Sequence, residues 1–363
     1  MLIDIATASP PYKVLQVKVA EELKKRMTGR PAVAKMIDAA SNHSGIDSRY
    51  FVLPDADDSE ENKFYSSDGN YIKPSTKIRM KEYEKWSLAL TEEAVEKLLK
   101  NVEFDSSKIN RLITISCTGF FAPGLDYNLI EKFQLPPTVK RTNIGFMGCA
   151  ASLIGFNSVL EAMVNSNEKG NTLLVSVELC SLHLQTEATK DNILANMIFA
   201  DGAAAVLFSS LESMKHKAKL EFLKTNSFMF KNSSDFMGWK IGDFGFEMIL
   251  SSELPKIILE EAVPVLKKIF ESCGIKQNEI KHWALHPGGR AILDSLQTGL
   301  GLNDDEMLPS RNVLKNYGNM SSASILFVLK EIFNTRAIKR NDIVCAIAFG
   351  PGLSMEVALM KGV

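Results

Sequence analysis

The chain has 363 residues, and its contents of 45% hydrophobic and 23% charged residues are those of an ordinary globular protein. Its 42 basic and 43 acidic residues give a net charge of −1, which provides no electrostatic basis for binding nucleic acid. The first residues, MLIDIATASPPYKVL, lack the basic start and apolar core of a signal peptide. The longest apolar run, residues 173–184, contains Glu178 and His183 and is shorter than the ~20 residues of a membrane span.

Five cysteines, an odd number, are spread along the chain. The two closest, Cys149 and Cys180, are too far apart for the spacing of a zinc site, and the chain is too long to be a small disulfide-linked domain. We therefore expect a cytoplasmic enzyme with reduced thiols and no metal.

The first half of the chain predicts five elements in succession. EEAVEKLLK, from Glu92, has the periodicity of an amphipathic helix, and RLITIS (111–116) is a short apolar strand. An apolar helix follows Gly148 in TNIGFMGCAASLIGFNSVL. NTLLVSVE, from Asn171, is a second strand, and FADGAAAVLF, from Phe199, is a glycine turn and a third strand.

The same succession returns in the second half. EEAVPVLKK follows from Glu260, HWALH covers 282–286, and an apolar helix follows Gly318 in VLKNYGNMSSASILFVLKE. NDIVCAIAF, from Asn341, and FGPGLSMEVA, from Phe349, complete the set. Four of the five matches have offsets of 168 to 171 residues, and the last has 150 because a segment is missing from the second half. The chain therefore contains an internal repeat.

This repeat predicts an α/β fold with two duplicated halves, residues 1–211 and 212–363. Helices that alternate with short apolar strands indicate sheets covered by helices. The helices after Gly148 and Gly318 are apolar on nearly all sides, so we expect them to lie buried between two sheets. The predicted architecture is a five-layer αβαβα sandwich.

The repeat places Cys149 opposite Asn319 and, through the matched strands, Cys117 opposite His286. Polar residues at symmetric helix starts and strand ends converge near the axis between the halves, where a site is expected. A free cysteine is often just a small buried hydrophobe. A cysteine that opens a buried helix opposite a histidine has two groups that lower its pKa, and a thiolate can attack a thioester.

His286 and Asn319 each allow a structural and a catalytic interpretation. His286 ends a strand in LHPGGRAILD, where it is either a core histidine with satisfied nitrogens or the partner of the thiolate. Asn319, in YGNMSSAS, is either a helix cap or an amide donor to a thioester oxyanion. The symmetry with Cys149 favours the donor. His183 follows a strand and is either cavity-lining or structural, whereas His43, His216 and His282 have ordinary polar or edge contexts.

Four segments together resemble the chalcone synthase-like type III polyketide synthases of the thiolase superfamily: GFMGCAA, HPGGRAILD, YGNMSSAS and FGPGLSMEV. The resemblance covers nearly the whole chain. HPGG combined with a late GPG is specific to this group, whereas the related ketoacyl synthase III enzymes carry HQAN-like and YGNTS-like motifs.

The resemblance implies that Cys149 accepts an acyl group from a coenzyme A thioester. His286 and Asn319 would hold the carbonyl of malonyl-CoA and stabilise the enolate that forms as CO₂ leaves. Repeated extension and cyclisation would give a pyrone, a resorcinol or a related aromatic, and fatty acyl starters are our preferred expectation. The family implies a homodimer that needs no cofactor, metal or acyl carrier protein.

The resemblance also assigns residues to the cavity. Phe199 matches the first aromatic gatekeeper, and Met248 falls at the second, two residues after Phe246. Cys117, Cys180 and His183 stand where threonines are usual, Trp239 falls near a position that is often glycine, and Ala122 replaces a methionine that crosses the dimer interface. Ser321 and Gly352 match the family. These departures from plant members indicate a microbial-type enzyme.

For the coenzyme A phosphates, Lys35 and Arg49 are the candidates, since the family shows three basic residues in this region. Either is equally compatible with a solvated surface charge. Two other functions remain open: a ketoacyl synthase III-like single condensation, and a thiol-dependent hydrolase of acyl thioesters. A thiolase-fold scaffold without catalysis would not need the Cys149, His286 and Asn319 set.

Overall fold

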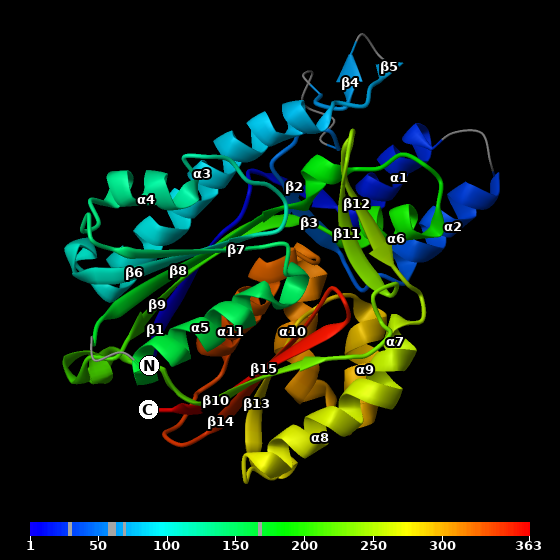
Figure 1. The fold of residues 1–363 in the computed structure, drawn as a ribbon. Helices are drawn as coiled ribbons and strands as arrows, with labels where there is room; N and C mark the ends of the chain where they lie inside the picture. Colours follow the sequence, from blue (N-terminus) through cyan, green and yellow to red (C-terminus); the bar gives the residue numbers. More distant parts are fainter. Residues whose placement is uncertain (28–30, 57–62, 68–69, 166–168) are drawn as a thin grey trace.

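The computed structural model describes residues 1–27, 31–56, 63–67, 70–165 and 169–363. Nine strands form one continuous sheet, which divides at the single β1–β10 pairing into two parts that face each other, called here the amino-terminal and carboxy-terminal sheets (Figure 1). The amino-terminal sheet has β6 parallel to both β7 and β8, while β9 and β1 are antiparallel additions. In spatial order its strands are β7 (Lys140–Gly145), β6 (Ile109–Ser116), β8 (Asn171–Leu179), β9 (Asp201–Ser209) and β1 (Leu2–Ala8).

The carboxy-terminal sheet repeats this arrangement without a counterpart of β7. Its order is β13 (Ile280–Leu285), β14 (Ile343–Gly350), β15 (Ser354–Gly362) and β10 (Leu220–Met229). β13 and β14 are parallel, and β15 and β10 are antiparallel to their neighbours. The two sheets meet where β1 pairs with β10 at Leu2 and Leu220.

Helices form the other three layers, as Figure 1 shows. α3 (Thr76–Val102) and α4 (Leu125–Phe133) cover the outer face of the first sheet. The second sheet is covered by α7 (Leu254–Ile257), α8 (Val263–Ser272), α9 (Arg290–Leu300) and α10 (Asp304–Tyr317). α5 (Ala151–Asn165) and α11 (Ser324–Thr335) lie between the sheets, and their apolar side chains join both sheets in one core. The predicted five-layer sandwich is thus confirmed.

The other elements lie mostly at one end of the sandwich (Figure 1). They are α1 (Gln16–Arg26), α2 (Pro31–Asn42), α6 (Lys190–Ile198), β2 (Tyr12–Leu15), β3 (Ser48–Phe51), β4 (Ser66–Ser67), β5 (Asn70–Tyr71) and the hairpin β11 (Met237–Gly242) and β12 (Gly245–Leu250). Short helical turns cover Ser106–Lys108, Gly148–Ala150, Cys180–His183, Glu212–Lys217, Gln277–Glu279 and Ser321–Ala323, and a π-turn covers Ile258–Ala262. None of the helices in the described residues is long and apolar enough to cross a membrane.

The repeat is confirmed in its central elements and corrected in three places. β6 matches β13, β8 matches β14, and α5 matches α11. The helix predicted from Glu260 is interrupted by the π-turn at Ile258–Ala262, because Pro264 cannot donate the hydrogen bond that a regular helix needs there.

The segments before the two glycine turns do not match, since residues 140–145 form the strand β7 whereas residues 310–315 lie in α10. The strands predicted after Phe199 and Phe349 do correspond, as β9 and β15, and the segment missing from the second half is α6; only the register of Phe199 with Phe349 is wrong. Phe349 lies within β14, and a tight turn at Gly352 (φ +100°) leads directly to β15, whereas Phe199 follows α6 and precedes β9. The predicted boundary at residues 211 and 212 falls between β9 and β10 and stays a prediction, because the halves share one core.

Candidate active site

Cys149 lies in the turn that joins β7 to the central helix α5. Gly148 adopts φ +61°, and a Cβ at this position would lie 2.3 Å from Cδ of Pro351. Only glycine therefore fits a turn that is pressed against the loop between β14 and β15. This turn places the cysteine at the amino end of α5, in a position that is 7% exposed.

The Cys149 thiol has polar neighbours from the opposite half of the chain. Its Sγ lies 3.7 Å from Oγ of Ser321, in the turn that leads into α11. Burial raises the pKa of Cys149 to about 12, and hydrogen bonds with the side chains of Ser321 and Asn319 counteract this shift. An isolated thiolate is therefore unfavourable here, and a positive partner is needed to form one.

His286 directly follows β13, and its backbone N–H donates to the carbonyl of Ile347 at 2.9 Å. The residue is 2% exposed, and burial lowers its pKa to about 3, so the ring is neutral. Neither Nδ1 nor Nε2 has a hydrogen-bond partner among the described residues. Buried polar atoms without a partner cost free energy, and in a cavity they are available to a ligand.

His183 is an informative contrast, because it is also buried and neutral, with a pKa lowered to about 3 by burial. Its Nδ1 accepts from the N–H of Phe246 at 2.9 Å, so Nε2 carries the proton and donates to the carbonyl of Thr118 at 2.7 Å. Both nitrogens are thus used within the protein. Of the two interpretations of His183, the structure favours the structural one.

Asn319 is held by a backbone bridge to the end of α6. Its N–H donates to the carbonyl of Ile198 at 2.9 Å, and its carbonyl accepts from Ala200 at 2.8 Å. Its side-chain oxygen accepts from the N–H of Ser321 at 2.8 Å, which leaves the amide Nδ2 as the donor end. Nδ2 makes a long bond of 3.3 Å to the carbonyl of Gly288. The side chain is thus oriented as an N–H donor.

One cavity of about 360 Å³ brings these three side chains together. It is also lined by the predicted residues Phe199, Met248, Cys117, Cys180, Trp239 and Ser321. Further lining is mainly aliphatic, from α6, β12, α7 and α9, and includes Leu194, Met197, Leu250, Leu254, Ile258 and Ile292. Three basic side chains join this lining: Lys190, Arg290 and the exposed His43, which had seemed ordinary in the sequence.

The hairpin β11–β12 forms one wall of this cavity. Trp239 and Met248 are cross-strand neighbours, and Nε1 of Trp239 donates to the carbonyl of Cys117 at 2.7 Å. His183 and Phe246 stack behind them with ring centroids 4.2 Å apart. A separate void of about 30 Å³ remains there, also lined by Trp239 and Met248, so this group fills space next to the cavity.

Gly352 is not among the described residues that line the cavity, whereas Pro351 is. Gly352 instead forms the β14–β15 turn, and its carbonyl accepts from Oγ of Ser233 at 2.7 Å. Its φ of +100° explains the glycine. The GPG segment therefore shapes the site through Pro351.

The two predicted phosphate contacts have different outcomes. Lys35 is exposed on α2, and its role stays a prediction. Arg49 is 1% exposed, and its Nη1 donates to the carbonyls of Asn196 (2.8 Å) and Phe199 (2.6 Å). The prediction for Arg49 is wrong, because a guanidinium enclosed in this way does not reach a phosphate at the surface.

Sequence reasoning missed Glu178, which lies beneath the site at the end of β8. Its Oε2 accepts from the N–H of Cys117 at 3.0 Å and from Oγ1 of Thr118 at 2.8 Å, while Oε1 accepts from Oγ of Ser322. It thereby ties the two halves together. The signal in the sequence is one acidic residue in an otherwise uncharged strand.

One largely apolar cavity thus holds a buried thiol, an amide donor and an imidazole without partners among the described residues, an arrangement suited to thiol-dependent acyl transfer. In the described parts of the chain, no three His, Cys, Asp or Glu side chains are grouped to hold a metal ion.

Comparisons with known proteins agree with this class. The family model "Chalcone and stilbene synthases, C-terminal domain" matches residues 221–363, and "FAE1/Type III polyketide synthase-like protein" matches residues 63–231. The chain belongs to the chalcone synthase-like type III polyketide synthases, which are acyl-transferring enzymes with a thiolase-like fold.

Individual relatives are distant but of similar length. The 1,3,6,8-tetrahydroxynaphthalene synthase of Streptomyces peucetius is 26% identical over 98% of this chain and 92% of its own. The α-pyrone synthesis polyketide synthase-like Pks18 of Mycobacterium tuberculosis is 27% identical over 77% of this chain and 71% of its own. The crystal structure of PKS-I from the brown alga Ectocarpus siliculosus superposes with a TM-score of 0.91 at 28% identity, covering 100% of this chain and 98% of that one.

Proposed function

We propose that this protein condenses malonyl-CoA repeatedly onto an acyl group carried by Cys149 and cyclises the product to a pyrone, a resorcinol or a related aromatic. The observation that carries the proposal is the buried His286 imidazole, which lines the same cavity as the thiol and the Asn319 amide. Neither of its nitrogens has a hydrogen-bond partner in the part of the chain that the structure describes.

Loading of the starter begins with transfer of the Cys149 proton to His286. Burial disfavours a charge on either group alone, but the two opposite charges attract strongly in a low-dielectric cavity. The sulfur then attacks the acyl-CoA carbonyl, the bond to the coenzyme A sulfur breaks, and the leaving thiolate receives the proton from His286.

In the extension step, His286 acts together with Asn319, and both side chains are hydrogen-bond donors. His286 and Nδ2 of Asn319 hold the thioester oxygen of malonyl-CoA while the bond to its carboxylate breaks and CO₂ leaves. They stabilise the enolate oxygen, and one donor of this kind is typically worth ~3–4 kcal/mol. The enolate carbon attacks the acyl thioester and releases Cys149. The lengthened chain, now on coenzyme A, returns to Cys149 for the next cycle.

The cavity lining supports coenzyme A thioesters with an alkyl starter. Lys190 and Arg290 can meet phosphates. Nζ of Lys190 donates to the Ser252 hydroxyl at 2.8 Å, and Nε of Arg290 lies 3.5 Å from the Asp294 carboxylate. The aliphatic residues of α6, β12 and α7 suit an acyl chain. We therefore propose fatty acyl starters and alkylpyrone or alkylresorcinol products, made without a metal, a cofactor or an acyl carrier protein.

A homodimer is proposed as well. β7 is the outermost strand of its sheet, and Phe120 and Met147, close to its end, are exposed apolar side chains. We further propose that the protein works in the reducing cytoplasm, in which its five free thiols would persist. Sedimentation of the purified protein tests the dimer.

Product analysis of variants tests the reaction. Replacing Cys149 by Ala should abolish chain extension and leave part of the decarboxylation of malonyl-CoA, because the donors for the enolate remain. Replacing His286 by Ala should impair both activities. The control is Cys273→Ala, which removes a thiol that does not line the cavity.

Three results would overturn the proposal. Full polyketide output from Cys149→Ala would remove the acyl carrier role. A single extension that requires an acyl carrier protein would favour a ketoacyl synthase III-like reaction. Release of free acid from acyl-CoA without CO₂ from labelled malonyl-CoA would favour a hydrolase.

A further inference from the structure

Arg49 is a fully buried cation whose hydrogen bonds lead to the active site. We propose that Arg49 is a positioning residue, which fixes the Asn319 amide and the Phe199 wall for the reaction. The inference rests on the proposed function, since it assigns a cause to the geometry of that site.

The guanidinium lies at the carboxyl end of α6. Nη1 donates to the carbonyls of Asn196 and Phe199, at 2.8 and 2.6 Å, where the helix ends and its last carbonyls lack partners within the helix. A cation at this end also interacts favourably with the helix dipole. Arg49 therefore fixes where α6 stops and where the Phe199 backbone begins.

That backbone holds Asn319 directly. Phe199 and Asn319 form an isolated parallel bridge, in which the N–H of Asn319 donates to Ile198 and the N–H of Ala200 donates to Asn319. A displacement of the Phe199 carbonyl thus displaces the catalytic asparagine by the same backbone pairing. The same movement shifts the Phe199 side chain, which lines the cavity.

The aliphatic stem of Arg49 supports Asn319 from a second direction. A Cβ on Gly318 would lie 2.8 Å from both Cγ and Cδ of Arg49, so the backbone just before Asn319 rests on this stem. The neighbouring Ser48 also reaches this segment, with Oγ 3.2 Å from the carbonyl of Asn316. β3 therefore supports the whole turn between α10 and α11.

The buried carboxylate of Asp201 interacts electrostatically with the Arg49 guanidinium and offsets part of the free-energy cost of burying this cation. Asp201 accepts from the N–H of Val52 at 2.9 Å and from the N–H and Oγ of Ser181 at 2.8 and 2.5 Å. Ser181 follows Cys180, another cavity residue. Arg49 and Asp201 together thus stabilise three segments that contribute to the cavity: the end of α6, the backbone of Asn319 and the turn at Cys180–His183.

The test uses Arg49→Lys, which keeps the charge but not the guanidinium, and Arg49→Met. Arg340→Met is the control, since Arg340 is an exposed arginine that does not line the cavity. Misplacement of a reacting group by about 1 Å costs on the order of 100-fold in rate. We expect kcat to fall about 10- to 100-fold in Arg49→Met and less in Arg49→Lys, with little change in KM. Thermal unfolding identifies the variants that fold, and Arg49→Lys carries the test if Arg49→Met does not.

Two comparisons separate positioning from other roles. Malonyl-pantetheine has the thioester but no phosphate, so positioning predicts the same fold loss with it as with malonyl-CoA. A loss confined to malonyl-CoA, with raised KM, would overturn the inference in favour of a phosphate contact. In the Asn319→Ala background, Arg49→Lys should not reduce malonyl decarboxylation further, whereas an unchanged additional loss would indicate a role that does not act through Asn319.

These outcomes are distinct from failure of the proposed function. If the wild-type protein forms no polyketide from malonyl-CoA and acyl-CoA, the proposed function fails. If it forms polyketide but the losses in malonyl decarboxylation of the Arg49 and Asn319 variants simply add, the positioning of Asn319 by Arg49 fails alone.

Discussion

The two buried histidines near the cavity show how a residue's role follows from its partners. His183 gives one nitrogen to a backbone carbonyl and the other to a backbone N–H, and its ring stacks on Phe246. His286 has an equally buried ring and no such partners in the described chain. An unsatisfied buried polar group costs about 1–3 kcal/mol, and this cost is offset if the group bonds a substrate in the transition state.

Glu178 leads to a prediction about pH. Burial raises its pKa to about 7, above the usual ~4.3 of an unfolded chain, so the folded protein binds the extra proton between these values. The free energy of unfolding should therefore decrease as pH rises from about 4.5 to about 7, by up to about 3 kcal/mol from this group, and then level off. Glu178→Gln should flatten this part of the profile.

Urea midpoints measured from pH 5 to 8 check the Glu178 prediction. The exposed Glu253→Gln is the matched control and should keep the wild-type profile. An identical slope in wild type and Glu178→Gln would mean that other groups cause the pH dependence.

That Cys149, His286 and Asn319 line one cavity agrees with what the sequence predicts, whereas the residues that support them could not be predicted. Cys149, His286 and Asn319 each stand beside a glycine or a strand end that the local sequence displays. Arg49 bonds carbonyls about 150 residues away, and Glu178 bonds Ser322 from the other half. The local sequence of a buried charge does not contain its distant partners, so both residues became interpretable only in the fold.

At the scale of elements, two hydrogen bonds connect the hairpin β11–β12 to the segment that follows β6. The acceptors are the consecutive backbone carbonyls of Cys117 and Thr118. Trp239 donates to the carbonyl of Cys117. His183 accepts from the N–H of Phe246 in the hairpin and donates to the carbonyl of Thr118.

Trp239→Gly should connect the void of about 30 Å³ behind Trp239 to the main cavity and shift the products toward longer chains. Trp239→Phe keeps most of the bulk and should preserve chain length. Mass analysis of products from one acyl-CoA compares the two, and equal chain lengths would contradict a size limit set by Trp239.

The contact between Gly148 and Pro351 couples the turn that holds Cys149 to the β14–β15 turn. Gly148→Ala should reduce activity at least tenfold, because the new Cβ meets Pro351 and φ +61° disfavours alanine by ~1 kcal/mol or more. Adding Pro351→Gly should restore part of the activity by removing the clash. Activity and unfolding midpoints of both variants test this coupling, which would be disproved if Pro351→Gly brought no recovery.

The elements themselves were predicted where hydrophobic periodicity is strong. The central helices and the strands β6, β8, β13 and β14 were found because each is a short, distinctly apolar segment. The sequence repeat pairs the segment before Gly318 with the segment before Gly148, but the first lies in the helix α10 and the second forms the strand β7. Whether a segment becomes a strand depends on its pairing with a neighbouring strand, which its local composition does not reveal.

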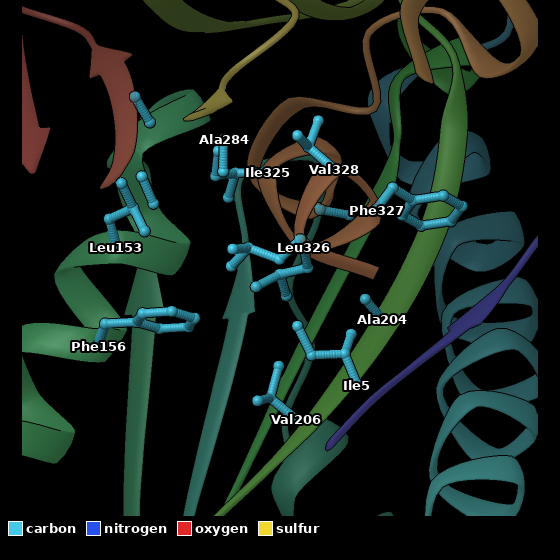
Figure 2. Packing of buried hydrophobic residues seen from close by; sticks show 14 of the residues in the cluster. Ile5, Leu153, Phe156, Ala204, Val206, Ala284, Ile325, Leu326, Phe327 and Val328 are labelled. Atoms are coloured by element: carbon cyan, nitrogen blue, oxygen red, sulfur yellow. The ribbon is translucent and has the colours of Figure 1, made fainter. Parts of the chain in front are cut away.

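For the whole molecule, the core is shared by both halves, so neither half buries its apolar face alone. Figure 2 shows Leu153 of α5 and Leu326 of α11 packed between the two sheets, which contribute Val206 of β9 and Ala284 of β13. The ring of Phe156 in α5 makes edge-to-face contacts with Phe208 of β9 and Phe222 of β10, at ring-centroid distances of 5.1 and 5.7 Å, respectively. One aromatic ring thus joins the two sheets.

Phe156→Ala should therefore destabilise the whole protein and not one half. Truncating a buried phenylalanine to alanine lowers the free energy of unfolding by about 3–5 kcal/mol.

Two tryptophans allow the halves to be followed separately. Trp86 in α3 reports on the amino-terminal half, and Trp283 in β13 reports on the carboxy-terminal half. Variants that keep one of these tryptophans, with the others replaced by Phe, give a separate fluorescence signal for each half. Both signals should shift to a lower urea midpoint by the same amount, because the shared core makes unfolding cooperative. If only the Trp86 signal shifted, the halves would unfold independently, and the residues positioned across their interface, Asn319 among them, would lose the rigid frame on which the site depends.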